Sequence, residues 1–304
     1  MLFRSFFETS QLLDGYDAIE TIASQPWSNG HVGMVGISYA GISQLFVARS
    51  QPPHLDAITP VSVIDDTWRG TLYPGGIYNN GFARNWAQER VDQNKWPNPN
   101  APGWVMQRIN GGDTTCADNM LLRGQNVDLM QTIRNNPYYS TKGIPGYPAG
   151  FDSVAATKFI ENIQVPTFIA GAWQDEQTGG HFPAMLPNFT GSPHVYVTLT
   201  NGLHTESLSP SVARRYLEFL QLYVAKKVPD LSLGPVIAST LGGAIWGVGE
   251  FAPFENRFAD MTYEQALAAF EGEKSVRVIF EQGGNAAYAP GTPEANFTAE
   301  FDRW

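Results

Sequence analysis

Cysteine and positive charge are the scarcest features of this sequence. Cys116 is the single cysteine among 304 residues, which excludes an intrachain disulfide and a metal site built from several cysteines. Lysine and arginine together number 19, against 29 acidic residues, and the net charge is −10. Nucleic acids and anionic membrane surfaces bind through clustered cations. We therefore expect neither of them as a partner.

Long hydrophobic runs are also missing. Residues 231–249 carry no charge and reach the length of a membrane span, but Pro235 and several glycines lower both their hydrophobicity and their helix propensity. We interpret them as a buried or partly covered connector and expect no membrane span. Residues 1–8 contain no sustained apolar run, so no signal peptide is expected. The sequence leaves the compartment and the oligomeric state open.

One short segment has the pattern of a catalytic serine turn. Residues 31–35 form an apolar run typical of a strand, and residues 42–49 have the spacing of an amphipathic helix. Between them lies Gly-Ile-Ser-Tyr-Ala-Gly, with Ser38 near its centre. Such a serine occupies a strained turn pressed between strand and helix, so its neighbours must be small, and Ala40 stands where glycine is usual. The alternative is an ordinary strand-to-helix turn with an incidental serine.

Strands and helices alternate along most of the chain. Further strands are expected over residues 55–63, 166–173 and 194–200. A turn at Asp14-Gly15 is expected to precede a helix over residues 16–23, and a long amphipathic helix is expected over residues 210–227. The apolar stripe of the long helix is predicted to be Ala213, Tyr216, Leu217, Leu220 and Val224. This alternation indicates an α/β fold with a doubly wound parallel sheet.

Aromatic and amide side chains dominate from residue 65 to about residue 150. Helical spacing is visible over residues 81–92 and 117–134. We interpret this part as a helical cap inserted over the working edge of the sheet, with an ordinary helical subdomain as the alternative. The side chains predicted to line an apolar acyl pocket are Trp68, Tyr73, Phe82, Trp86 and Trp173. Core packing explains such aromatics equally well.

A serine hydroxyl needs a base to take its proton and a carboxylate to orient that base. In a doubly wound sheet these groups lie at the carboxyl ends of strands. His31 and His194 open strands and His54 precedes one, so these three lie at the wrong end. His204 directly follows the strand at 194–200 and fits best, with His181 second.

The acid is expected on a strand end between the serine and the histidine. Asp175 follows the strand at 166–173, which gives the chain order Ser38, Asp175, His204 found in α/β-hydrolases. In this interpretation Ser38 is the nucleophile, His204 the base, and Asp175 the group that orients and stabilises the imidazolium. The backbone N–H of Tyr39, at the start of the helix, is predicted to be an oxyanion donor.

Several segments resemble the peptidase S15 family, which includes X-Pro dipeptidyl-peptidases and the CocE/NonD esterases and acylases. Four of them surround the serine turn, at residues 14–20, 25–30, 32–39 and 52–55. Residues 171–175 resemble the acid segment of the family, and residues 201–204 resemble its histidine loop. The match covers roughly residues 10–230.

The resemblance implies an α/β-hydrolase domain over residues 1–228, with a cap at about 65–160. It also implies that residues 229–304 form a connector and the beginning of a C-terminal β jelly roll, whose entry would be residues 276–280. Family members carry several strands before the helix at Asp14, one of which supplies a tyrosine as second oxyanion donor. The resemblance therefore implies a fragment truncated at both ends, with that donor outside this chain.

Two classes of function follow from these observations. The first is a serine hydrolase that cleaves an ester or amide through an acyl-enzyme, acting either like an X-Pro dipeptidyl-peptidase or like an acyl esterase. Its substrate would be a small molecule or a peptide. The second is a catalytically incompetent fragment or binding scaffold of the same family. A metal enzyme is disfavoured because no set of His, Asp and Glu has ligand spacing, so neither a metal nor a cofactor is predicted.

Overall fold

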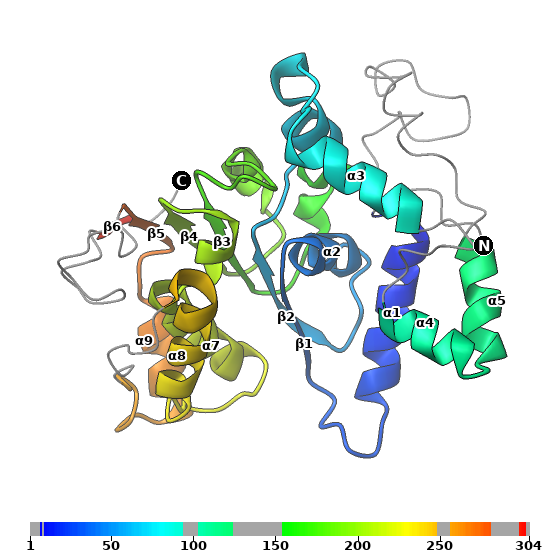
Figure 1. Cartoon of the computed structure of the whole chain (residues 1–304). Coiled ribbons are helices and arrows are strands. Elements are labelled where there is room, and N and C mark those ends of the chain that lie inside the picture. Colours follow the sequence, from blue (N-terminus) through cyan, green and yellow to red (C-terminus); the bar gives the residue numbers. More distant parts are fainter. Residues whose placement is uncertain are drawn as a thin grey trace. The chain divides into compact units, whose positions relative to one another are not determined.

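The computed structural model describes residues 7, 9–93, 103–123, 154–247, 256–280 and 298–301 (Figure 1). The chain divides into two compact units. One comprises residues 1–11 and 66–155, and the other comprises residues 12–65 and 156–304. The second unit contains the sheet and is considered first.

Six strands form one sheet in the order in which they occur along the chain. They are β1 (Val32–Ile37), β2 (Leu55–Val61), β3 (Thr167–Ala172), β4 (Val195–Thr200), β5 (Val276–Ile279) and β6 (Thr298–Phe301). The first five are parallel, and β6 runs antiparallel to β5. A parallel sheet with interleaved helices is the α/β-hydrolase architecture predicted from the sequence.

Helices and 3₁₀ turns connect the strands and cover the sheet. The α-helices are α1 (Thr9–Ala23), α2 (Tyr39–Ala48), α7 (Pro210–Tyr223), α8 (Gly234–Trp246) and α9 (Tyr263–Glu271). The 3₁₀ turns are η5 (Ala156–Lys158), η6 (Ile160–Asn162), η7 (Phe182–Asn188) and η8 (His204–Leu208). Helix α9 is capped by Thr262, whose hydroxyl accepts a hydrogen bond from the N–H of Gln265 at 3.3 Å. That bond satisfies one of the donors left open at a helix start.

The strand register aligns the carboxyl ends of the parallel strands. Ile37 lies opposite Val61, Val61 lies opposite Ala170, and Ala172 lies opposite Thr200. Residues that directly follow β1, β2, β3 and β4 therefore occupy one edge of the sheet. This is the edge at which open α/β sheets bind ligands.

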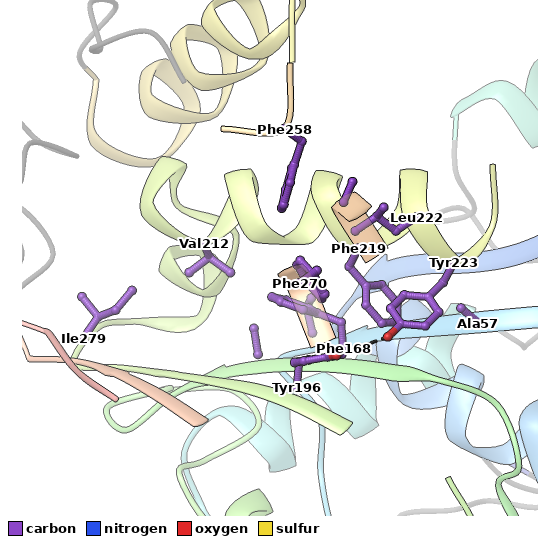
Figure 2. Close-up of a cluster of buried hydrophobic side chains, with 13 residues drawn as sticks. Ala57, Phe168, Tyr196, Val212, Phe219, Leu222, Tyr223, Phe258, Phe270 and Ile279 are labelled. Atoms are coloured by element: carbon purple, nitrogen blue, oxygen red, sulfur yellow. Dashed lines mark hydrogen bonds between the residues drawn. The ribbon is translucent and has the colours of Figure 1, made fainter. Parts of the chain in front are cut away.

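An aromatic core fixes α7 on one face of the sheet. Figure 2 shows side chains of α7 facing those of β3 and β4. The ring centroids of Phe168 and Phe219 are 5.8 Å apart, and those of Phe219 and Tyr223 are 4.7 Å apart. Burying one such side chain contributes about 1.5–3 kcal/mol. The sheet is thereby held rigid beneath its carboxyl edge.

The apolar stripe predicted for α7 is partly wrong. Tyr216 and Val224 do pack against the core, but the fully buried face also carries Arg215 and Glu218, at 2% and 1% exposed. Glu218 is paired with the guanidinium of Arg257 at 2.6 Å. A buried carboxylate is tolerated only when it is paired, and this partner lies too far along the chain for the helical pattern to reveal it.

The turn predicted at Asp14-Gly15 is also wrong, because both residues lie inside α1. A Cβ atom on Gly15 would lie 2.3 Å from Cγ2 of Val47 in α2. The glycine therefore permits close packing of two helices and does not mark a turn.

Strand β5 corrects the expected entry to a jelly roll. Val276–Ile279 pairs in parallel with β4 and is the fifth parallel strand of the sheet. A short alternating run predicts a strand but does not identify its sheet. The uncharged stretch at 231–249 contains α8, and within the described ranges no helix combines the length and hydropathy needed to cross a bilayer.

The other unit is built from short helical elements. They are η1 (Thr67–Leu72), η2 (Pro74–Gly76), α3 (Phe82–Gln93), α4 (Gly103–Asn110) and α5 (Thr114–Arg123). A small core gathers Trp68, Leu72, Ala83 and Ala87, with Tyr73 and Tyr78 packed against it. The helix predicted over residues 117–134 coincides with α5 in its first part, and the remainder lies outside the described residues.

Candidate active site

Ser38 occupies the turn between β1 and α2 in a conformation that serine rarely adopts. Its backbone has φ 62° and ψ −128°, in the positive-φ region that favours glycine. The N–H of Ser38 donates to the carbonyl of Val61 at 2.9 Å, and its carbonyl accepts from the N–H of Ile42 at 2.7 Å. Strand β2 and the first turn of α2 thus hold the serine on both sides. Such strain is concentrated at functional sites and costs about 1–3 kcal/mol.

The small residues around Ser38 are required by close contacts. A Cβ atom on Gly36 would lie 2.6 Å from Cβ of Ala40, and one on Gly41 would lie 2.4 Å from the carbonyl oxygen of Val61. Either side chain would push α2 away from the sheet. The tightest approach to β2 thus falls at Gly41, while Ala40 packs against Gly36.

His204 and Asp175 form a buried pair at the same edge of the sheet. The Nδ1 atom of His204 is 2.7 Å from Oδ2 and 2.9 Å from Oδ1 of Asp175. Their side chains are only 5% and 1% exposed. The loop after β3 supplies the aspartate, and the first residue of η8, after β4, supplies the histidine. With Nδ1 held by the carboxylate, Nε2 is the imidazole nitrogen available for proton transfer.

Three further donors converge on the carboxylate of Asp175. The backbone N–H groups of Gln177 and Thr178 donate to Oδ1 at 2.8 and 2.7 Å, and the hydroxyl of Thr178 donates to Oδ2 at 2.6 Å. Burial alone would raise the pKa of Asp175, but the hydrogen bonds from His204 and Thr178 outweigh it and hold this pKa below its usual value. Asp175 is therefore a carboxylate at neutral pH.

The loops that carry the pair are tied to each other. The backbone N–H of Gln174 donates to the carbonyl of Gly202 at 3.2 Å, and its side-chain amide donates to Oδ1 of Asn201 at 2.8 Å. These bonds fix the two loops relative to each other where β3 and β4 end. Within the described residues, no hydrogen bond joins the Ser38 hydroxyl to His204.

Tyr39, the predicted oxyanion donor, is the first residue of α2. Backbone N–H groups at a helix start point away from the helix along its axis, where the helix dipole favours negative charge. The N–H of Tyr39 therefore lies at the positive end of the α2 dipole, directly after Ser38.

The five aromatics predicted for a pocket fall in both units. Trp68 is 2% exposed and its ring lies 5.0 Å from that of Tyr73, so both contribute to the small core of the first unit. Phe82 is at the border of exposure at 36%, and Trp86 is half-buried. Trp173, which directly follows β3 in the second unit, is 45% exposed.

A second histidine–aspartate pair was not foreseen. Nδ1 of His181 lies 2.7 Å from Oδ2 of Asp65, whose side chain is 6% exposed, while that of His181 is 63% exposed. Sequence reasoning noted His181 but did not connect it to an acid, because Asp65 lies 116 positions away. Thr178 was also missed, although an aspartate side chain commonly accepts from backbone N–H groups shortly after it, as Asp175 does from Gln177 and Thr178. No group of three or more His, Cys, Asp or Glu side chains within the described residues is arranged to hold a metal ion.

Comparison with known proteins gives the family of the chain. The family model for X-Pro dipeptidyl-peptidase (S15 family) matches residues 3–206. A curated relative, cocaine esterase of Rhodococcus sp. (strain MB1 Bresler), is 41% identical over 64 residues, which cover 21% of this chain and 11% of the esterase.

Solved structures support the same architecture. A CocE/NonD family hydrolase from Staphylococcus aureus superposes with a TM-score of 0.58 at 18% identity, covering 99% of this chain and 39% of that one. An aminopeptidase from the marine sediment archaeon Thaumarchaeota archaeon gives a TM-score of 0.51 at 17% identity, covering 97% of this chain and 43% of that one. At these identities the likeness establishes the fold alone.

The chain spans only part of the length of these proteins, at most 14% of the first curated relatives and about two fifths of the structural ones. The family model nevertheless matches about two thirds of the chain, and that part includes the serine turn, the acid loop and the start of the histidine turn. The chain belongs to the peptidase S15 family of α/β-hydrolases, in which the CocE-type esterases are also found.

Proposed function

We propose that this chain carries the catalytic centre of a serine hydrolase, with Ser38 as nucleophile, His204 as base and Asp175 as the orienting acid. The observation that carries the proposal is the strained backbone of Ser38, held by β2 at the carboxyl edge of the sheet. A serine gains nothing in stability from such a conformation, since glycine would adopt it without strain. A nucleophile held at the strand-to-helix turn gives this strain a function.

In the acylation step the Ser38 hydroxyl attacks the carbonyl carbon of an ester or amide, and Nε2 of His204 takes its proton. The tetrahedral oxyanion accepts a hydrogen bond from the Tyr39 N–H. Asp175, ionised because its pKa is lowered by its hydrogen bonds, stabilises the imidazolium that forms. His204 then returns the proton to the departing alcohol or amine, which leaves the acyl group on Ser38.

In the deacylation step water replaces the alcohol or amine. His204 takes a proton from water, the hydroxide attacks the acyl carbonyl, and the carboxylic acid leaves as Ser38 recovers its proton. Both steps use the same three side chains and require no cofactor. Small acyl esters are the preferred substrate class, because the curated relatives that match are esterases by name. Release of a dipeptide after proline is the second candidate, supported by the name of the family model.

Labelling with a fluorophosphonate probe tests the proposal directly. The probe phosphonylates an activated serine, so mass spectrometry of the wild-type chain should find the label on Ser38. Ser38→Ala should abolish labelling, whereas Ser43→Ala, which removes a half-buried hydroxyl of α2 bonded to the Ala40 carbonyl, should leave it unchanged. A folded wild-type chain whose Ser38 stays unlabelled would instead favour a non-catalytic scaffold.

A further inference from the structure

Ser62 is a buried serine at the end of β2 whose backbone is strained like that of Ser38. It has φ 49° and is 1% exposed. Its N–H donates to the carbonyl of Ala170 in β3 at 2.8 Å, so the strained residue is anchored to the neighbouring strand. A non-glycine residue with this φ is uncommon and persists where the surroundings impose it. The strained backbone holds the Ser62 hydroxyl in place, and the contacts of this hydroxyl indicate its role.

That hydroxyl contacts the backbone of His204 and the side chain of Ser207. Oγ of Ser62 lies 2.9 Å from the carbonyl oxygen of His204 and 2.8 Å from Oγ of Ser207. The Ser62 hydroxyl is the donor in both contacts, so its single proton is shared between the carbonyl oxygen of His204 and Oγ of Ser207. All three residues are buried, and a buried hydrogen bond of this kind is costly to leave unmade.

The other side of the same residue is held by Glu176. The backbone N–H of His204 donates to Oε2 of Glu176 at 3.0 Å. Burial alone would raise the pKa of Glu176, but hydrogen bonds from the backbone N–H of His204, from its own N–H and from the side chain of Gln177 together lower it. The acceptor is therefore ionised at neutral pH, and such charge-assisted bonds are the stronger ones.

We propose that Ser62 and Glu176 are positioning residues that fix the backbone of His204 from its two sides and thereby hold its imidazole on Asp175. Only two side-chain torsions separate the imidazole from the backbone, so a fixed backbone and a fixed Nδ1 leave the ring one orientation. Three contacts from two loops then converge on one residue: Ser62 on its carbonyl, Glu176 on its N–H, and Asp175 on its ring.

The inference rests on the proposed function for its effect on rate, because His204 acts there as the base. A displacement of the base by about 1 Å costs on the order of 100-fold in rate. Its effect on the imidazole itself does not depend on activity. The hydrogen-bonded Nδ1 proton of His204 reports the contact with Asp175 whether or not Ser38 reacts.

Two pairs of variants separate positioning from stability. Ser62→Ala and Ser62→Gly both remove the hydroxyl, but glycine relieves the strain at φ 49° and should leave the more stable protein of the two. Glu176→Gln keeps an acceptor for the His204 N–H, whereas Glu176→Ala removes it. Ser209→Ala is the matched control, since Ser209 is equally buried and its hydroxyl bonds Ser211 at 2.7 Å.

The experiment measures fluorophosphonate labelling of Ser38 and the low-field Nδ1 proton signal of ¹⁵N-histidine-labelled chain. We expect Ser62→Ala, Ser62→Gly and Glu176→Ala each to slow labelling by roughly ten- to a hundredfold. Each should also shift or broaden the His204 signal. Glu176→Gln, which keeps a neutral acceptor, should have a smaller effect than Glu176→Ala, and Ser209→Ala should stay near wild type. Wild-type labelling together with an unchanged signal in Ser62→Gly would overturn the inference.

The same experiment distinguishes this inference from the proposed function. If wild-type Ser38 does not react, the proposed function fails and the Nδ1 signal alone decides the positioning role. A signal that is altered by Ser62→Gly but not by Ser209→Ala supports the role in that case, and a signal unaltered by both contradicts it. If Ser62→Gly labels as slowly as Ser62→Ala in spite of its greater stability, loss of folding cannot be the cause.

Discussion

Two histidine–aspartate pairs in the unit that contains the sheet have the same contact distance and very different surroundings. Nδ1 lies 2.7 Å from Oδ2 both in His204–Asp175 and in His181–Asp65. The imidazole of His204 is 5% exposed, however, and that of His181 is 63% exposed. A charged pair is stronger and better oriented where water is excluded. Distance alone therefore does not identify a catalytic pair.

The two pairs also differ in what holds the histidine. The backbone of His204 is bonded on both sides, by Ser62 and by Glu176, and its aspartate accepts from Thr178. His181 lies just before the turn η7, and its side chain makes no capping hydrogen bond to that turn. A fixed base can be aimed at one atom, whereas an exposed imidazole exchanges its contacts with water. This difference is the reason for proposing the buried pair, and not the exposed one, as the catalytic base and its orienting acid.

The largest expected effect comes from neutralising each aspartate in turn. Asp175→Asn should lower the rate of Ser38 labelling by about 10⁴-fold, because an amide neither sets the tautomer of His204 nor stabilises its cation. Asp65→Asn removes the charge from the other pair and should change the rate only a few-fold. The measurement is the second-order rate constant with a fluorophosphonate. A larger loss in Asp65→Asn than in Asp175→Asn would reverse the assignment of the two pairs.

A smaller effect is expected from the threonines that support the two pairs. Thr178→Val removes the hydroxyl that donates to Asp175 at 2.6 Å and should cost about 1.5–3 kcal/mol in the free energy of unfolding. Labelling should slow by roughly tenfold, since the backbone donors remain. Thr157→Val is the matched control, because Thr157 donates to the backbone carbonyl of Asp65 at 3.2 Å.

Thr157→Val should lose only about 0.5–1.5 kcal/mol of stability and keep the wild-type labelling rate. Urea titrations give the stabilities of both variants. Equal losses of rate in the two threonine variants would mean that the surroundings of Asp175 have no special role in orienting His204.

The sequence predicted one of the two pairs and missed the other for a physical reason. Ser38 directly follows β1, Asp175 and His204 come shortly after β3 and β4, and the parallel register brings strand ends to one edge. Each position can therefore be located from local patterns. Asp65 also follows a strand closely, but His181 lies deeper in a loop, whose path depends on packing that the sequence pattern does not express.

Other differences have the same origin. Gly15 is indistinguishable in sequence from a turn glycine, and only the nearby Val47 reveals that it permits helix packing. Glu218 is charged and buried because the distant Arg257 pairs with it. Arg215 is buried with its guanidinium bonded to the backbone carbonyl of Lys274 at 2.6 Å. Val276–Ile279 is recognisable as a strand, but its parallel pairing with β4 is a long-range property. Local conformation was thus predictable where it does not depend on contacts with residues distant in the sequence.

The dependence of the free energy of unfolding on pH in the acid range should also distinguish the buried pair from exposed carboxylates. The pKa of Asp175 in the folded chain lies below its usual value of 3.8, so the folded state binds this proton less tightly than the unfolded state does. The contribution of Asp175 to stability is therefore complete above about pH 4 and is lost as the pH falls through the folded-state pKa.

Below pH 4 the free energy of unfolding of Asp175→Asn should consequently change less steeply with pH than that of the wild type. Asp17→Asn, which removes an exposed carboxylate of α1, should retain the wild-type slope. The measurement is the free energy of unfolding by urea at a series of pH values. Identical slopes for all three proteins would show that Asp175 is not held in its ionised form by the contacts of the buried pair.

Chemical modification of His181 is expected to have the smallest effect on activity. The same experiment separates the two pairs by the exposure of their histidines. Diethylpyrocarbonate reacts with accessible neutral imidazole, so His181 should be modified early and His204 late, as their exposures of 63% and 5% require. Peptide mass spectrometry resolves the two residues from the other exposed histidines. Ser38 labelling should stay near its initial rate while His181 is consumed, and should fall only as His204 reacts. If labelling instead declines in step with the modification of His181, and His181→Ala abolishes labelling, then His181 of the exposed pair supplies the base and the roles assigned to the two pairs are reversed.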